Sequence, residues 1–188
     1  MPSVSDPDPV PSEAFEQAVS DVRLIHRDYR TALSTARQRP VGRFNAERSA
    51  TSNRATHLAI AAIVAIVEHY AEVVLLDAGH DAKTLRDWKA KETAWQSAFG
   101  VDLRTSCSHF VAMIGFYEAR TAVMHARGSL TDAQRRTPRR EAVDDALKSA
   151  GIQRHRRELI LTPKVAANCA SVCCAALREM EDSRRGTS

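Results

Sequence analysis

The feature that most constrains the fold is a run of ten apolar residues, Leu58 to Val67, inside a longer segment with helical periodicity. We predict a helix over 46–78 that Gly79 closes, because glycine commonly follows the last residue of a helix. One side of this helix carries the residues Ile60, Ile63, Val67, Ala71 and Val74, which indicates a core-facing stripe. Ten apolar residues are too few to cross a bilayer, so we expect a buried helix and no membrane contact.

The composition favours helices along the rest of the chain. Aromatic residues make up 5% of the 188 residues, and glycine and proline number seven each. Apolar residues also recur three and four positions apart after Ser12, over 84–99, after Ser106 or Ser108, and after Thr162-Pro163, where Ser, Thr or Pro residues suit helix starts. A further helix is expected to begin at Pro138. The predicted fold class is all-α, an up-down helical bundle of four core helices plus one or two extra helices.

The length suits a single domain. Residues 1–12 include four prolines, three serines and two aspartates, a composition that favours a disordered N-terminal tail. We expect one bundle domain over 13–182 and a flexible tail over 183–188. Pro40-Val-Gly42 is expected to end the first helix.

The four cysteines, Cys107, Cys169, Cys173 and Cys174, do not form a pattern typical of secreted proteins, which favours a reducing, cytoplasmic location. The sequence contains no Cys-x-x-Cys, His-x-x-x-His or Glu-x-x-His motif. We therefore expect no metal and no cofactor.

The charge balance is basic and comes from arginine. The net charge is +4, and the sequence contains 22 arginines against 5 lysines. Arginine suits two-pronged contacts with phosphate, so this bias permits RNA binding. Four arginines around Thr137-Pro138 are candidate contacts for an RNA backbone: Arg135, Arg136, Arg139 and Arg140. Arg154 to Arg157 form a second basic cluster, and a solvated surface is the ordinary interpretation of both.

One arginine and one histidine stand out inside an apolar helical segment. Arg120 and His125 enclose Thr-Ala-Val-Met, and Gly128 follows as a helix stop. Chance alone gives roughly 0.8 such spacings in a chain of this composition, and a second copy does occur at Arg104 and His109. Context separates the two copies, because a charge within an apolar helix must be paired or reach water. The second copy lies in a polar stretch that suits a loop and a helix cap.

The run from Ala119 to Gly128 resembles the signature of the HEPN-domain family, particularly its ribonuclease-type members with an Arg-x-x-x-x-His motif. The likeness extends weakly over about residues 50–180, where the segment from Leu58 to Tyr70, with Glu68 inside it, resembles the second HEPN helix. In the family, Asn or another strongly polar residue typically follows the arginine, and here Thr121 stands there. Some relatives carry a tyrosine two residues after the histidine, where this chain has Arg127.

The resemblance implies a metal-independent endoribonuclease, in which the substrate's 2′-hydroxyl attacks the adjacent phosphate. His125 would move protons and Arg120 would stabilise charge on the phosphate oxygens. Thr121, Glu68 and Arg127 are expected to support them, Glu68 as an ionic partner that orients Arg120 of its own subunit or of a symmetry-related one. The resemblance also implies a homodimer with a composite site, a toxin or phage-defence role, and an antitoxin protein as a partner.

A dimer also follows from helix geometry. Five residues turn an ideal helix by about 500°, so Arg120 and His125 point roughly 140° apart on a single helix. A two-fold interface would bring two arginines and two histidines to one cleft.

Three alternatives stay open at this point. Arg120 could simply bridge Glu118 or Glu68 while His125 caps the helix end, and Glu68 could be an ordinary exposed glutamate. The domain could bind RNA or a nucleotide without cutting it, which Thr121 favours because its hydroxyl can bond back to the helix backbone. Alternatively, a stripe that includes Ala61 and Ala65 could bind a protein partner, as in a helical interaction module.

Overall fold

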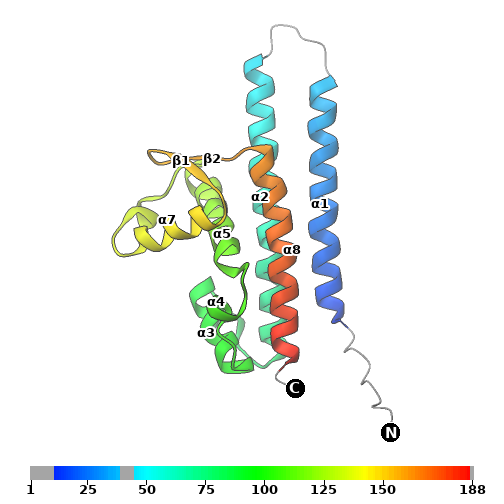
Figure 1. Ribbon diagram of the computed structural model, residues 1–188, viewed down its shortest axis with the longest axis vertical. Coiled ribbons are helices and arrows are strands. Elements are labelled where there is room, and N and C mark those ends of the chain that lie inside the picture. The colour runs from blue at the N-terminus through cyan, green and yellow to red at the C-terminus, as the bar shows by residue number, and fades with distance from the viewer. Residues whose placement is uncertain (1–10, 39–44, 187–188) are drawn as a thin grey trace.

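Four long helices form the body of the protein. The computed structural model describes residues 11–38 and 45–186. Its long helices are α1 (Glu13–Gln38), α2 (Asn45–Asp77), α5 (Phe110–Ala126) and α8 (Pro163–Arg185). Successive long helices run in opposite directions, as Figure 1 shows. The predicted all-α, up-down bundle is confirmed.

The long helices begin and end where their capping residues are. The Ser12 hydroxyl accepts a hydrogen bond from the Phe15 N–H at the start of α1. Gly79 has a φ of 89° just after α2, a conformation that glycine adopts without strain. The Thr162 hydroxyl accepts from the Val165 N–H, with Pro163 in the first turn of α8. These predicted starts and stops are confirmed. The predicted stop at Pro40-Val-Gly42 lies outside the described residues, as do 1–10 and 187–188.

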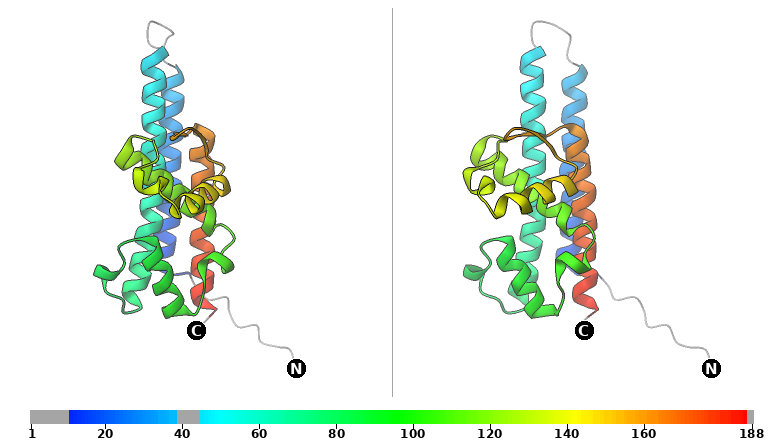
Figure 2. Two further views of the ribbon diagram at one scale, coloured as in Figure 1. Left: turned by 90° about the vertical axis from the view of Figure 1, so that its left-hand side faces the viewer. Right: turned by 60° about the vertical axis from the view of Figure 1, so that its left-hand side comes forward.

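The core lies around α2, which packs against α1, α5 and α8 (Figure 2). The five residues of its predicted core stripe are all buried. The segment Asn53–Asp77 is also long and apolar enough to cross a membrane, although half of its most apolar window is buried within the protein. Burial against three neighbouring helices accounts for this apolar character, because the central helix of a bundle needs apolar residues on several sides.

The segment between α2 and α5 differs from its predicted boundaries. A short 3₁₀ helix, η1 (Ala82–Thr84), precedes α3 (Trp88–Phe99), and α4 (Leu103–Ser106) follows. The helix predicted to begin at Thr84 begins at Trp88, because the Asp87 carboxylate accepts from the Ala90 N–H. The prediction that Ser106 or Ser108 caps α5 is also wrong. Glu179 of α8 accepts from the His109 N–H at 2.9 Å instead.

Between α5 and α8 the chain forms a small layer outside the bundle. It contains α6 (Asp132–Arg135), α7 (Arg139–Ser149), β1 (Gln153–His155) and β2 (Glu158–Ile160). The two strands form an antiparallel hairpin in which His155 pairs with Glu158. The predicted helix start at Pro138 agrees with α7, which begins one residue later, whereas neither strand was predicted. Here α7 packs on α5, and the hairpin leads back to α8 (Figure 1).

The C-terminal boundary of the bundle lies later than the predicted residue 182. Helix α8 continues to Arg185, since Arg184 and Arg185 both form ion pairs with the buried carboxylate of Glu181. The indole N–H of Trp95 also donates to the Ser183 hydroxyl at 3.4 Å. The predicted flexible tail over 183–188 is therefore helical at its first three residues.

Candidate functional site

Arg120 and Glu68 form an ion pair between α5 and α2. The distance from Arg120 Nη1 to Glu68 Oε2 is 2.7 Å, and the two side chains are 31% and 18% exposed. Burial raises the pKa of Glu68, and the charge of Arg120 opposes that rise. The predicted contact between the two residues is confirmed. It leaves the guanidinium held in place but open to solvent on one side.

His125 lies in the last turn of α5 and is exposed. Its ring makes no hydrogen bond or ion pair with any residue that the structure describes. The helix end is closed by backbone groups instead, because the N–H groups of Arg127 and Gly128 both donate to the Ala122 carbonyl. One half of the alternative, in which the His125 ring caps the helix, is therefore wrong for the described residues, whereas its other half, the bridge from Arg120 to Glu68, is present.

The other two predicted supporting residues shape the helix more than the site. The Thr121 hydroxyl donates to the Tyr117 carbonyl at 3.1 Å, the back-bond that its position allows. Arg127 has a φ of 53°, the left-handed conformation that turns the chain out of α5. Its side chain is exposed.

A histidine that the sequence analysis did not select lies beside the same helix end. A Cβ atom placed on Gly128 would lie 3.2 Å from Cε1 of His57, so the His57 ring packs closely against the Gly128 backbone. Burial lowers the pKa of His57. Because α2 runs antiparallel to α5, His57 lies beside the end of α5, and Glu68, about three turns further along α2, lies beside Arg120. In the sequence, the spacing of eleven residues between His57 and Glu68, about three helical turns, could have indicated that both lie on the same face of α2.

The second Arg-x-x-x-x-His copy serves the structure. Arg104 binds both carboxylate oxygens of Glu92, at 2.6 and 2.8 Å. His109 Nδ1 lies 2.9 Å from Glu179 Oε1. Arg104 thereby joins α4 to α3, and His109 joins the start of α5 to α8.

The four arginines predicted to contact RNA differ in their polar partners. Arg139 binds Glu118, which is only 7% exposed and also accepts from the side chain of Gln134. Arg135 forms an ion pair with Asp132, and Arg140 Nε lies 3.7 Å from Asp144. Arg136 is exposed and contacts no polar group of a described residue. Arg139 therefore links α7 to α5, and Gln134 links α6 to it, although the side chains of all four arginines are exposed.

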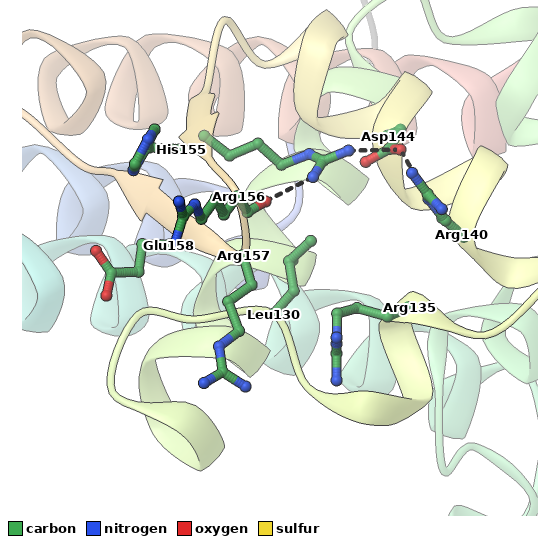
Figure 3. A pocket seen from close by; sticks show the side chains of 9 residues that line it. Leu130, Arg135, Arg140, Asp144, His155, Arg156, Arg157 and Glu158 are labelled. Carbon is green, nitrogen blue, oxygen red and sulfur yellow. Dashed lines mark hydrogen bonds and ion pairs between the residues drawn. The ribbon is translucent and has the colours of Figure 1, made fainter.

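Two of these arginines line a pocket together with the hairpin, which sequence reasoning left out of the site. The pocket, of about 650 Å³, lies between α6, α7 and the turn of the hairpin (Figure 3). Its lining consists of Leu130, Arg135, Arg140, Asp144, Arg154, His155, Arg156, Arg157 and Glu158. The basic run from Arg154 to Arg157 was the sequence signal for positive charge here. It lines a pocket only because the chain folds back at the hairpin turn.

The hairpin is hydrogen-bonded to the chain that leaves α5. The Leu159 N–H donates to the Gly128 carbonyl at 2.9 Å, and the Leu130 N–H donates to the Arg157 carbonyl at 2.7 Å. Between them, Ser129 pairs with Glu158 as an isolated bridge. The basic pocket is thereby fixed relative to the end of α5, where His125 lies.

Comparisons with protein-family models, with curated proteins and with solved structures found no match.

Proposed function

We propose that the protein is a metal-independent endoribonuclease of the HEPN type, which cleaves RNA through attack of a 2′-hydroxyl. The observation that carries the proposal is the state of the two motif residues. Glu68 holds Arg120 at 2.7 Å while the guanidinium stays partly exposed, and the His125 ring is exposed without a partner among the described residues. A cation held in place and a free imidazole are the two groups that such a reaction requires.

The roles follow from the chemistry of the two side chains. An imidazole can accept a proton on one ring nitrogen and donate one from it, so His125 takes the proton from the attacking 2′-hydroxyl or gives one to the leaving 5′-oxygen. The ion pair uses Nη1 of Arg120, which leaves other N–H donors of the guanidinium to bind the non-bridging phosphate oxygens. Glu68 positions Arg120 and touches no substrate in this scheme.

A homodimer completes the proposed site. The two motif residues point about 140° apart around a single helix, so one protomer directs only one of them at a given phosphate. Two-fold pairing of the exposed end of α5 would place Arg120 of one protomer beside His125 of the other.

Mixing two inactive variants tests this composite arrangement. Arg120→Ala and His125→Ala proteins, each inactive alone, should recover cleavage when unfolded and refolded together, because the mixed dimer keeps one intact pair. Separately refolded proteins that are then combined without exchange provide the control. Persistent inactivity of the mixed dimer, with its formation shown by native mass spectrometry, would contradict a shared site.

A second candidate is an RNA-binding domain of the same type that does not cut. The observation that favours it is the Thr121 hydrogen bond to the Tyr117 carbonyl, which directs the hydroxyl to the helix backbone and away from a substrate. The third alternative, a protein-binding stripe, finds less support. Ala61 is buried, and Ala65 lines a small groove between α1 and α2, so the two do not form one free face.

The biological setting is also a proposal. The described cysteines are all free, which suits a reducing cytoplasm. A toxin or phage-defence nuclease of this kind would act on cellular RNA and be held in check by an antitoxin protein. Expression of the wild-type protein should then slow bacterial growth, and His125→Ala should relieve the effect.

Cleavage of a mixed-sequence RNA in EDTA tests the proposed activity. We expect fragments with the wild-type protein and with His69→Ala, an exposed histidine of α2 that serves as the matched control. The variants Arg120→Ala and His125→Ala should yield none. RNA that is retained in a gel shift but never cut would support the binding domain instead.

Glu68→Gln tests whether the carboxylate positions Arg120. Loss of the ion pair should lower kcat by about tenfold or more, since small displacements of a catalytic group are costly, while KM changes little. Asp77→Asn, an exposed carboxylate at the end of α2, is the control and should leave both constants unchanged. An unaltered kcat in Glu68→Gln would show that the ion pair serves only the fold.

A further inference from the structure

The hairpin pocket concentrates positive charge on a fold element that the proposed chemistry does not use. Five of its lining residues are arginines, against the two acids Asp144 and Glu158. A concave surface with a clear excess of guanidinium groups favours anions, and phosphate is the anion that arginine matches in shape.

Some arginines of the pocket form ion pairs that hold the hairpin in place, and others have no ion pair with a described residue. Arg154 donates to the Arg156 carbonyl at 2.6 Å and to Asp144 at 3.0 Å, which ties the hairpin turn to α7. Arg140 shares the same aspartate. The side chains of Arg156 and Arg157 are exposed and bind no polar group of a described residue. Two guanidinium groups at the tip of the turn are therefore free to bind a ligand.

The turn itself is held in an uncommon conformation. Arg156 has a φ of 54°, where glycine, asparagine or aspartate is the usual residue of a two-residue hairpin turn. The hydrogen bond from Arg154 to its carbonyl helps to hold that backbone. Backbone strain of this kind clusters at binding and catalytic sites.

The pocket lies close to the end of α5, where His125 is. In Figure 3 the side chains of Arg157 and Arg135 extend to the same side of the pocket, with Leu130 between them. Leu130 is five residues after His125, and its N–H donates to the Arg157 carbonyl. Even a fully extended chain of that length spans only about 17 Å, so a strand of a few nucleotides would reach from His125 to the pocket.

We propose that this pocket binds backbone phosphates of the RNA strand beside the bond that is cut, with Arg156, Arg157 and Arg135 as the contacting residues. The inference rests on the proposed function for its choice of ligand. Arg154 and Arg140 position the turn through their ion pairs with Asp144. The negative charge of Glu158 reduces the net positive charge of the pocket. The pocket thus supplies affinity for longer RNA and takes no part in the chemical step.

Binding of an RNA analogue that cannot be cut tests the pocket apart from catalysis. The probe is a fluorescent oligonucleotide with every 2′-hydroxyl methylated, measured by anisotropy over a range of salt. Arg156→Gln/Arg157→Gln should weaken binding about tenfold and reduce the slope of log K against log salt by about 1.4, as expected for two lost contacts to a single strand. Arg135→Gln, outside the hairpin, should lower the slope by about half as much.

The matched control removes the same charge elsewhere. Arg23→Gln/Arg30→Gln alters a second basic groove, on α1, where both side chains are exposed. It should leave the affinity and the salt slope close to those of the wild type. Equal losses in both double variants, or no loss in the hairpin variant, would overturn the assignment. Tight binding of ATP that the hairpin variant abolishes, with unchanged RNA affinity, would assign the pocket to a free nucleotide instead.

Cleavage kinetics separate this inference from the proposed activity. A dinucleotide is too short to reach the pocket and should be cut equally by the wild type and the hairpin variant. A longer oligoribonucleotide should show a raised KM and an unchanged kcat in that variant. If the wild type cuts nothing and the anisotropy result still holds, the nuclease proposal fails and the pocket stands. If the wild type cuts RNA but the hairpin variant and Arg135→Gln bind the uncleavable oligonucleotide as tightly as the wild type, the pocket proposal is wrong and the nuclease proposal stands.

Discussion

At the scale of single residues, Arg120 and His125 have different surroundings. The sequence predicted the contact of Arg120 but not the histidine that lies near His125. The carboxylate on α2 at Glu68 follows ten apolar residues, which made it a candidate partner for Arg120, and the 2.7 Å ion pair bears this out. The packing of His57 on Gly128 could not be foreseen, because it depends on how far α2 and α5 slide past each other. Helical periodicity specifies a face but leaves that offset open.

Arg127 offers a direct test of the turn that ends α5. Its φ of 53° is strained for a residue with a Cβ atom, so Arg127→Gly should raise the free energy of unfolding by roughly 1 kcal/mol. The control is Arg136→Gly, where φ is −80° and where glycine should lower it by about 0.4–1 kcal/mol. Urea denaturation of both variants gives the two signs. A loss of stability in Arg127→Gly would contradict the described helix end.

At the scale of helices and strands, local signals predicted the long helices well and the hairpin not at all. Ser12, Thr162 and Gly79 act at helix ends through their own side chain or backbone, so their effect can be read from nearby sequence. The hairpin turn has Arg156 and Arg157 where a glycine or asparagine would have signalled it. Leu159, Ile160 and Leu161 are all apolar in the sequence, so the alternation of two buried leucines with an exposed isoleucine is seen only in the structure.

The crossing of α5 and α7 depends on one glycine. A Cβ atom on Gly115 would lie 2.1 Å from the Ala146 carbonyl oxygen, which belongs to the backbone and cannot rotate away. Gly115→Ala should therefore lower the free energy of unfolding by about 3 kcal/mol or more. Gly186→Ala is the control, since its nearest neighbour would lie 3.8 Å away, and it should change stability by less than about 0.5 kcal/mol. Chemical denaturation of the two variants measures the difference, and equal stabilities would show that the helices do not cross there.

At the scale of the whole molecule, one buried carboxylate joins three of the four long helices. Glu181 of α8 accepts from the Ser12 N–H before α1, from the Tyr70 hydroxyl of α2 and from Arg184 and Arg185. Burial would raise the pKa of Glu181, but these hydrogen bonds outweigh it and lower the pKa to about 2. The composition predicted a helical bundle. The contacts of Glu181 could not be predicted, because Ser12 and Tyr70 are more than 100 residues away from it in the sequence.

The lowered pKa of Glu181 predicts a loss of stability in acid. A depressed carboxyl pKa stabilises the fold fully above its unfolded value of 4.5, and the contribution disappears as pH falls from there to about 2. The wild type should lose roughly 3 kcal/mol over this range through this group. Glu181→Gln should be less stable at neutral pH, with a flatter acid profile, and the exposed Glu16→Gln should follow the wild type. Parallel profiles for all three proteins would refute the assignment.

The most direct measurement of the central claim is the chemistry of the cut ends. A defined oligoribonucleotide is incubated with the protein in EDTA, and the fragments are weighed by mass spectrometry. Attack by the 2′-hydroxyl predicts a 2′,3′-cyclic phosphate on the upstream fragment, no cut at a site whose nucleotide is 2′-deoxy, and no fragments with His125→Ala. Fragments with 5′-phosphate and 3′-hydroxyl ends, or a cut that persists in His125→Ala, would contradict the account.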